Sequence, residues 1–127
     1  MSTKPKIICI GGATQDVFLS GKALAGRRDV RTKAIVEQFP LGDKLTIDQV
    51  HYSTGGDASN AAVTFARQGL AASFIGKVGH DVAGAQVLRE LKQEGVDVSS
   101  VIMDTQKGTA YSTILVAPSG GRVVLNY

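Results

Sequence analysis

The first apolar run of the chain extends from Lys6 to Ile10 and stops at Gly11-Gly12. A short β-branched run bounded by glycines is typical of a buried strand, and we expect one here. The residues that follow, up to Leu19, read as a further extended segment. Asp16 is the only charged residue in that segment. Because a carboxylate among apolar residues needs a partner, Asp16 is either a structural hydrogen-bonding group or a ligand-binding group.

Helical spacing of apolar residues predicts two helices, over 59–68 and 82–94. Asp81 precedes the second helix and is expected to cap it. Strands are expected after each helix, at 73–78 and 98–103. This alternation predicts parallel strands joined by crossover helices, which is an α/β fold. Both helices are followed by a glycine and an apolar residue: Gly69-Leu70 and Gly95-Val96.

Two short strands at 35–39 and 45–52 interrupt this alternation, because they lie between the first strand and the first helix. The basic segment 20–34 before them is expected to be an irregular loop. Two further strands, 109–117 and 122–127, flank a Pro-Ser-Gly-Gly turn and predict a hairpin. The two inserted strands at 35–39 and 45–52 are expected to form a small separate sheet. Since only about three parallel strands precede the end of the sequence, we infer that the chain is the N-terminal part of a larger domain.

The composition is that of an ordinary globular domain, with 127 residues, 43% hydrophobic and 20% charged. The net charge of +3 is mildly basic. No aromatic residue interleaves the basic cluster, so we interpret it as a solvated loop and expect no nucleic-acid partner. The cluster consists of Lys22, Arg27, Arg28, Arg31 and Lys33.

Cys9 is the single cysteine and lies within the first apolar run. A lone cysteine in such a run is usually a small buried hydrophobic residue, and no disulfide can form within the chain. The N-terminal residues show neither a signal peptide nor a membrane span. We therefore expect a cytoplasmic protein without a membrane partner.

The strongest candidate for a ligand site is the stretch Gly55-Gly56-Asp57-Ala58-Ser59-Asn60. Adjacent glycines let the backbone adopt positive φ or approach a ligand closely. Short polar side chains at 57, 59 and 60 can meet the free N–H groups of a first helical turn, so they are either ligand contacts or helix caps. The cap is the stronger interpretation for Ser59. From spacing alone, the stretch could also cradle a phosphate at a helix start.

Other residue types give no site. His51 and His80 have no second histidine, cysteine or carboxylate at metal-ligand spacing, so we interpret both as structural or surface residues and expect no metal site in this segment. The glycines after the first strand lack the G-x-G-x-x-G spacing, which argues against a dinucleotide site.

Two motifs together resemble the first signature of the ribokinase-like (PfkB) sugar and nucleoside kinases. They are Gly55 to Ala62, which includes the di-glycine stretch, and Gly76 to Gly84, which reads Gly-Lys-Val-Gly-His-Asp-Val-Ala-Gly. The resemblance covers most of the 127 residues. It implies the N-terminal portion of a ribokinase-like domain over 1–127, with signature α/β units at 55–103 and β-lid strands at about 35–52 and 109–127.

The resemblance also implies substrate contacts. Asp16 matches the family aspartate that binds substrate hydroxyls, while Gly56 and Asn60 match contacts of the di-glycine motif. Asp57 stands where ribokinases proper carry lysine, and Thr14 replaces a family asparagine. The implied substrate-binding residues are Thr14, Asp16, Gly55, Gly56, Asp57, Asn60 and Ser112.

The family's second signature, which carries the catalytic base and the anion hole, is absent from these 127 residues. The resemblance therefore implies an ATP-dependent kinase acting on a sugar or nucleoside hydroxyl. This segment would hold substrate residues but no catalytic residue, and alone it would be inactive and bind neither ATP nor Mg²⁺. The alternative is a non-catalytic truncated chain or an interaction module using the lid strands. Open lid edges could also pair two subunits as a homodimer.

Overall fold

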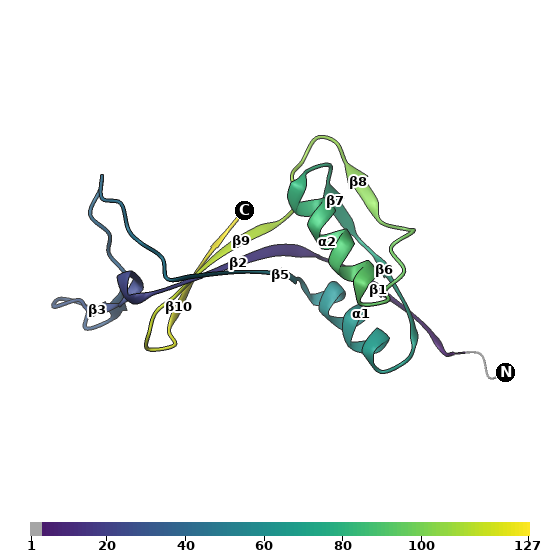
Figure 1. The fold of residues 1–127 in the computed structure, drawn as a ribbon, viewed down its shortest axis with the longest axis horizontal. Helices are drawn as coiled ribbons and strands as arrows, with labels where there is room; N and C mark the ends of the chain where they lie inside the picture. Colours follow the sequence, from purple (N-terminus) through teal and green to yellow (C-terminus); the bar gives the residue numbers. More distant parts are fainter. Residues whose placement is uncertain (1–3) are drawn as a thin grey trace. The chain divides into compact units, whose positions relative to one another are not determined.

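The computed structural model describes residues 4–127, which separate into two compact units. The first unit contains the residues up to Asp16, the segment Ser53–Ser112 and Tyr127. The second contains Val17–Tyr52 and Thr113–Asn126. Each is described on its own below, and Figure 1 shows the elements in chain order by colour.

The first unit is built on a parallel strand pair. Strand β1 (Lys6–Ile10) pairs in parallel with β6 (Ala71–Ile75), with Lys6 opposite Ala71 and Ile10 opposite Ile75. Helix α1 (Asp57–Arg67) precedes β6 in the chain and packs on both strands (Figure 1). This arrangement confirms the predicted α/β fold, because parallel neighbours require a crossover connection.

A second parallel pair follows. Strand β7 (Lys77–Gly79) pairs with β8 (Ile102–Asp104), and helix α2 (Val82–Gln93) lies between them in the chain. The strand predicted over 98–103 is therefore wrong in most of its length. Asp97 forms a parallel bridge with Ser73, and its carboxylate then accepts the Ser99 N–H at 2.9 Å. That side-chain bond turns the backbone and delays the strand until Ile102.

The core of the first unit lies between the helices and one face of the strands. Phe74, Ala62, Val87 and Leu91 are at most 1% exposed. Cys9 is buried in the same cluster, as predicted. The prediction of a buried first strand is wrong, however. Ile8 and Ile10 are 60% and 75% exposed, because α1 covers only the face of β1 that carries Cys9.

The helix ends follow the sequence at three of four positions. Gly69 and Gly95 have φ of +89° and +79°, the left-handed geometry that ends a helix. Asp81 caps α2 by accepting the Gly84 N–H at 2.7 Å, as predicted. The start of α1 differs, since the helix begins at Asp57 and not at Ser59. Gly56, with φ +103°, occupies the N-cap position.

The second unit is mostly strand. Strands β2 (Thr14–Ser20), β5 (Gln49–Gly55) and β9 (Tyr111–Val116) each have residues in both units. With β10 (Arg122–Asn126) they form a four-stranded sheet in the order β10-β9-β2-β5. The predicted hairpin between β9 and β10 is confirmed, and its turn is closed by the Gly120 N–H donating to the Ala117 carbonyl at 2.9 Å.

The inserted strands are shorter than predicted. Only Ile35–Val36 of the segment 35–39 is a strand, β4, and it pairs with β3 (Arg27–Arg28) in a two-stranded sheet of its own. The segment 20–34 is thus not wholly irregular, and it also holds a 3-10 helix, η1 (Lys22–Leu24). The strand predicted at 45–52 begins only at Gln49, because the Asp48 carboxylate accepts the Lys22 N–H at 3.0 Å.

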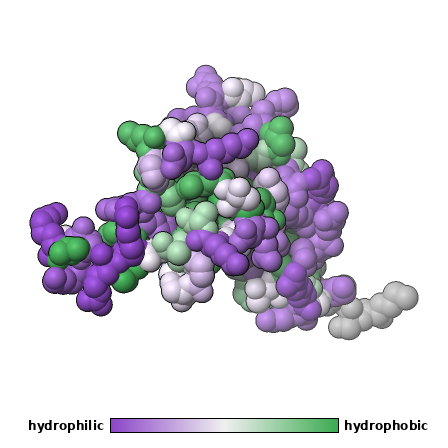
Figure 2. Space-filling model, turned by 60° about the vertical axis from the view of Figure 1, so that its left-hand side comes forward, coloured by the Kyte–Doolittle hydropathy of each residue, from purple (hydrophilic) through white to green (hydrophobic). Residues whose placement is uncertain are grey.

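Several large apolar side chains reach the surface. The face drawn in Figure 2 shows separate hydrophobic areas between hydrophilic ones. On the strands, the exposed apolar residues include Ile8, Ile10, Val50, Ile102, Val123 and Leu125. No helix among the described residues combines the length and apolar character needed to cross a membrane.

Candidate functional site

Asp16 and Gly55 lie directly against each other. A methyl group built on Gly55 would come within 2.1 Å of Asp16 Oδ2 and 2.8 Å of its Cγ. Only a glycine leaves room for the carboxyl group at this point of β5. The structure therefore brings together two residues that are 39 positions apart in the sequence and that the sequence reasoning assigned to one site.

Ser112 on β9 forms a side-chain hydrogen bond with Asp16. Burial raises the pKa of Asp16 above its ordinary value, and a hydrogen bond from the Ser112 side chain offsets part of the rise. Ser112 is 8% exposed, so its hydroxyl is held in place by packing. The predicted residues Asp16, Gly55 and Ser112 thus form one cluster with a half-buried carboxylate at its centre.

Gly56 is the next residue, and its backbone passes close to the turn after β1. A methyl group on Gly56 would lie 2.5 Å from the Gly12 carbonyl oxygen and 2.7 Å from the Ala13 Cα. Its φ of +103° is also unfavourable for any residue with a side chain. Both reasons make glycine necessary here, and the tight packing fixes where α1 begins.

Asp57 bonds two backbone amides with one oxygen. Its Oδ1 accepts the Ala58 N–H at 2.8 Å and the Gly12 N–H at 3.1 Å. These bonds lower the pKa of Asp57. A negative charge in the first turn also suits the helix dipole. The carboxylate ties the turn after β1 to the start of α1.

Ser59 is not the helix cap that the sequence indicated. Its hydroxyl donates to the carbonyls of Gly55 at 2.5 Å and Gly56 at 3.0 Å, whereas a cap would accept from a backbone N–H. Ser59 is 1% exposed. Its role is to hold the two glycines against the first turn of α1.

Asn60 and Thr14 are placed near this cluster by their elements. Asn60 is exposed in the first turn of α1, and its backbone N–H donates to the Gly56 carbonyl at 3.0 Å. Thr14 begins β2 two residues before Asp16, so both side chains lie on the same face of the strand.

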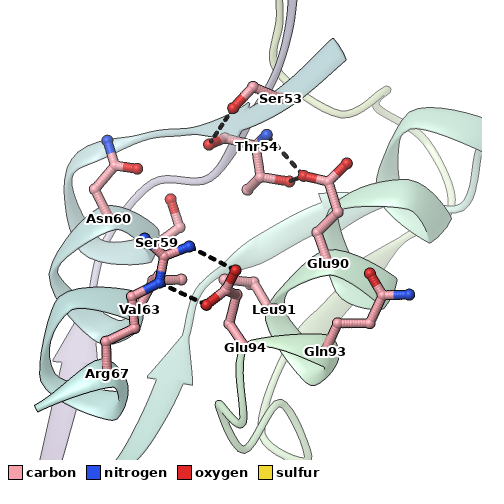
Figure 3. A pocket seen from close by; sticks show the side chains of 10 residues that line it. All are labelled: Ser53, Thr54, Ser59, Asn60, Val63, Arg67, Glu90, Leu91, Gln93 and Glu94. Atoms are coloured by element: carbon pink, nitrogen blue, oxygen red, sulfur yellow. Dashed lines mark hydrogen bonds and ion pairs between the residues drawn. The ribbon is translucent and has the colours of Figure 1, made fainter.

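A pocket of about 370 Å³ opens between β5, α1 and α2. Its wall is mostly polar, and two groups of side-chain contacts cross it (Figure 3). At one end, Glu90 accepts from Thr54; at the other, Arg67 donates to Glu94 at 2.6 and 2.7 Å. The lining residues are Ser53, Thr54, Ser59, Asn60, Val63, Arg67, Glu90, Leu91, Gln93 and Glu94.

Sequence reasoning missed the pairing of Glu90 with Thr54. Glu90 lies on the polar side of α2, where the helical pattern predicts only solvent. The spacing of Gln86, Glu90 and Glu94 by four residues was the available signal, since it aligns three polar side chains on one face. Nothing in the sequence indicated which element that face meets.

The second motif, Gly76 to Gly84, is held by a network of hydrogen bonds around Asp81. The Asp81 carboxylate accepts the Thr109 N–H at 2.8 Å and its hydroxyl at 2.7 Å, besides capping α2. The Thr109 hydroxyl in turn accepts the Gly79 N–H at 2.9 Å. These bonds lower the pKa of Asp81. The motif residues therefore fix the loop before α2 to the segment that leads into β9.

No metal-binding cluster is found in the part of the chain that the structure describes: residues 4–127 contain no group of three or more histidine, cysteine, aspartate or glutamate side chains that could hold an ion. His80 is exposed and precedes the Asp81 cap, and His51 is exposed on β5 beside Phe18, with ring centroids 6.1 Å apart.

The sequence of this chain is similar to those of known carbohydrate kinases. Residues 27–127 match the model of the pfkB family carbohydrate kinases. The chain is 29% identical over 124 residues to a bifunctional ribokinase/ribose-5-phosphate isomerase A of Fructilactobacillus sanfranciscensis, covering 96% of this chain and 20% of that protein. It is 45% identical over 83 residues to a fructokinase of Escherichia coli, covering 65% of this chain and 25% of that protein.

The fold is also shared with solved structures. Arabidopsis thaliana ribokinase, complexed with ribose and ATP, superposes with a TM-score of 0.76 over 99% of this chain and 36% of the other, at 18% identity. At that identity the likeness concerns the fold alone. The chain thus spans between a fifth and two fifths of the length of these proteins.

Proposed function

This chain belongs to the pfkB family of carbohydrate kinases, and from that premise we propose that it supplies the sugar-binding part of a cytoplasmic enzyme. The enzyme would transfer a phosphoryl group from ATP to a hydroxyl of a sugar or nucleoside. The observation that supports this most is the half-buried Asp16 carboxylate, set against Gly55 and held by Ser112. The relatives named fructokinase and ribokinase make a sugar the first substrate class to test.

The chemistry suits such a role. Phosphoryl transfer depends mainly on positioning the attacking hydroxyl and on stabilising charge. A carboxylate accepts hydrogen bonds from two hydroxyl groups, and such charge-assisted bonds are strong. Because Gly55 has no side chain, the Asp16 carboxylate lies directly against the backbone of β5. Asn60, exposed in the first turn of α1, carries both a donor and an acceptor for a vicinal diol.

ATP and Mg²⁺, when bound, would supply the phosphoryl group and neutralise its charge. Residues 4–127 contain no cluster of side chains that fits a metal ion, so we assign no Mg²⁺ ligand to them. We propose that this segment binds and orients the sugar, and that the catalytic base and nucleotide-binding residues lie outside it. On this proposal the 127 residues alone are inactive.

The decisive experiment uses the full-length protein and a panel of sugars and nucleosides with ATP. We expect turnover of at least one panel member, and Asp16→Ala should abolish its binding without lowering the unfolding midpoint. Asp43→Ala removes an exposed loop carboxylate and is the matched control, with affinity expected to stay unchanged. Absence of turnover on the whole panel would refute the proposed activity. Unchanged affinity in Asp16→Ala would remove Asp16 from the site.

We also propose that the second unit pairs two copies of the chain through its strands. Val50, Val123, Val124 and Leu125 are 40–54% exposed on β5 and β10, which are the two edge strands of the four-stranded sheet among the described residues, and an open strand edge can pair with a second copy. Sedimentation velocity should show a dimer that Leu125→Lys shifts toward monomer. A monomer at every concentration of the wild type would refute the pairing.

A further inference from the structure

We propose that Glu90 of α2 is a positioning residue for the di-glycine turn, acting through Thr54 on the sugar side of the site. The inference rests on the proposed function, since it concerns how the Gly55-Gly56 turn is held against Asp16. Glu90 does not bond the glycines themselves. Its hydrogen bonds to the strand go to Thr54, which lies outside the cluster of Asp16, Gly55 and Ser112.

The contact is made by one carboxylate oxygen. Glu90 Oε2 accepts the Thr54 backbone N–H at 2.9 Å and the Thr54 hydroxyl at 2.6 Å. Figure 3 shows the Glu90 side chain reaching from α2 to the end of β5. Thr54 directly precedes Gly55, so the fixed backbone amide is one peptide unit from the glycine that faces Asp16.

The strand needs this support because β5 is at the edge of its sheet. In the order β10-β9-β2-β5 it has a strand neighbour, among the described residues, only on the β2 side. Its outward N–H groups therefore lack a ladder partner. At Thr54 the Glu90 carboxylate accepts the N–H that would otherwise have no strand partner. This bond fixes the end of β5 just before Gly55.

Glu90 is itself held in place. Its second oxygen accepts the Gln86 side-chain amide at 2.5 Å, one helical turn earlier. Burial acts to raise the pKa of Glu90, but the hydrogen bonds from Thr54 and Gln86 outweigh it, so the pKa is lowered overall. The group is therefore a fully bonded carboxylate at neutral pH, with a rotamer restricted at both oxygens.

The C-cap residue of the same helix, one turn after Glu90, provides a matched control. Glu94 also crosses the pocket, but it bonds Arg67 at the far end of α1, where the guanidinium side chain is 67% exposed. Both glutamates link α2 to another element, and only Glu90 bonds the strand that leads into the glycines. Comparison of the two separates positioning of the turn from general attachment of α2.

The test measures sugar and ATP kinetics of the full-length protein carrying Glu90→Ala, Glu90→Gln, Thr54→Val or Glu94→Ala. Glu90→Ala should raise the sugar KM about tenfold to a hundredfold, since small misplacements of binding groups have effects of this size. The ATP KM should stay within about twofold. Glu90→Gln keeps an acceptor for Thr54 and should recover part of the loss. Glu94→Ala should leave the sugar KM within about twofold, because exposed ion pairs contribute little.

Amide hydrogen exchange gives a second readout that does not depend on activity. Peptides covering residues 50–60 should exchange at least several-fold faster in Glu90→Ala and at the wild-type rate in Glu94→Ala. If the wild type phosphorylates no sugar, the proposed function fails, while the exchange result still decides whether Glu90 holds the turn. Unchanged exchange in Glu90→Ala overturns the inference. Lower stability with an unchanged sugar KM also overturns it, because that pattern indicates a structural role only.

Discussion

The contact between Gly55 and Asp16 can be tested by adding a single methyl group. In Gly55→Ala the new Cβ would lie 2.1 Å from Asp16 Oδ2, 2.8 Å from Cγ and 3.2 Å from Oδ1. Carbon and oxygen atoms do not approach this closely without a bond, so either the carboxyl group or the strand has to move. Since Gly55 is not among the positive-φ glycines, the methyl adds no backbone strain, and the whole cost comes from the clash.

Overpacking of this kind costs about 1–3 kcal/mol of unfolding free energy. If the clash is with Asp16 alone, the cost of Gly55→Ala should fall below about 0.5 kcal/mol once the carboxyl group has been removed by Asp16→Ala. The double-mutant cycle should then give a coupling of about 0.5 kcal/mol or more, as expected for residues in direct contact.

Urea unfolding of the wild type, both single variants and the double variant measures this cycle. Gly69→Ala is the control, because nothing lies within 4 Å of its Cβ and its φ of +89° is the only source of cost. We expect it to lose about 1 kcal/mol equally with and without Asp16. An equal cost of Gly55→Ala in both backgrounds would refute the contact on which the candidate site is built.

Three further outcomes follow from side chains described above. Thr109→Val leaves the buried Gly79 N–H without its acceptor and should lower the unfolding free energy by about 1–3 kcal/mol. The control Thr64→Val, at an exposed position, should lower it by less than about 0.5 kcal/mol, and equal losses in denaturant titrations would contradict the prediction. Because hydrogen bonds lower the pKa of Asp81 from 3.8, its stabilisation is present above that pH and is lost as pH falls through the folded value. The midpoint difference between wild type and Asp81→Asn should therefore shrink in acid, and a constant difference would count against it. Burial raises the pKa of Asp16 above 3.8, so its contribution is greatest below that pH and is lost as pH rises through the folded value. Asp16→Asn should accordingly raise the thermal midpoint at pH 7, and a lower midpoint would show that the carboxylate is not penalised by burial.

The parts of the fold that depend on local chemistry were predictable from the sequence. The glycines after each helix and the Asp81 cap act within one turn, so their residue types identify them. Strand limits were less predictable, because side chains of distant residues decide them. The Asp97 carboxylate shortens one strand and the Asp48 carboxylate delays another, and neither bond leaves a pattern in the sequence.

The candidate site shows the same division. The glycine pair and the lone aspartate were recognisable by residue type, and the structure places Asp16 against Gly55. Which oxygen bonds which amide was not predictable, since Ser59 donates where a cap would accept. Glu90 was missed for a related reason. A polar residue on a helix surface has the same pattern whether it meets water or the backbone of another element.

The single oxygen of Asp57 also constrains how this position can change over evolution. It accepts the N–H groups of both Gly12 and Ala58, and the family resemblance described above implies a lysine at the equivalent position of ribokinases proper. A lysine accepts neither N–H and places a positive charge at the start of a helix, which the dipole disfavours. A direct replacement would therefore release the turn at Gly11-Gly12 before any new substrate contact could form. Substitutions that secure this turn by other means have to come first, so the order of mutations is restricted, and position 57 should depend on positions 11 and 12 in any combinatorial library.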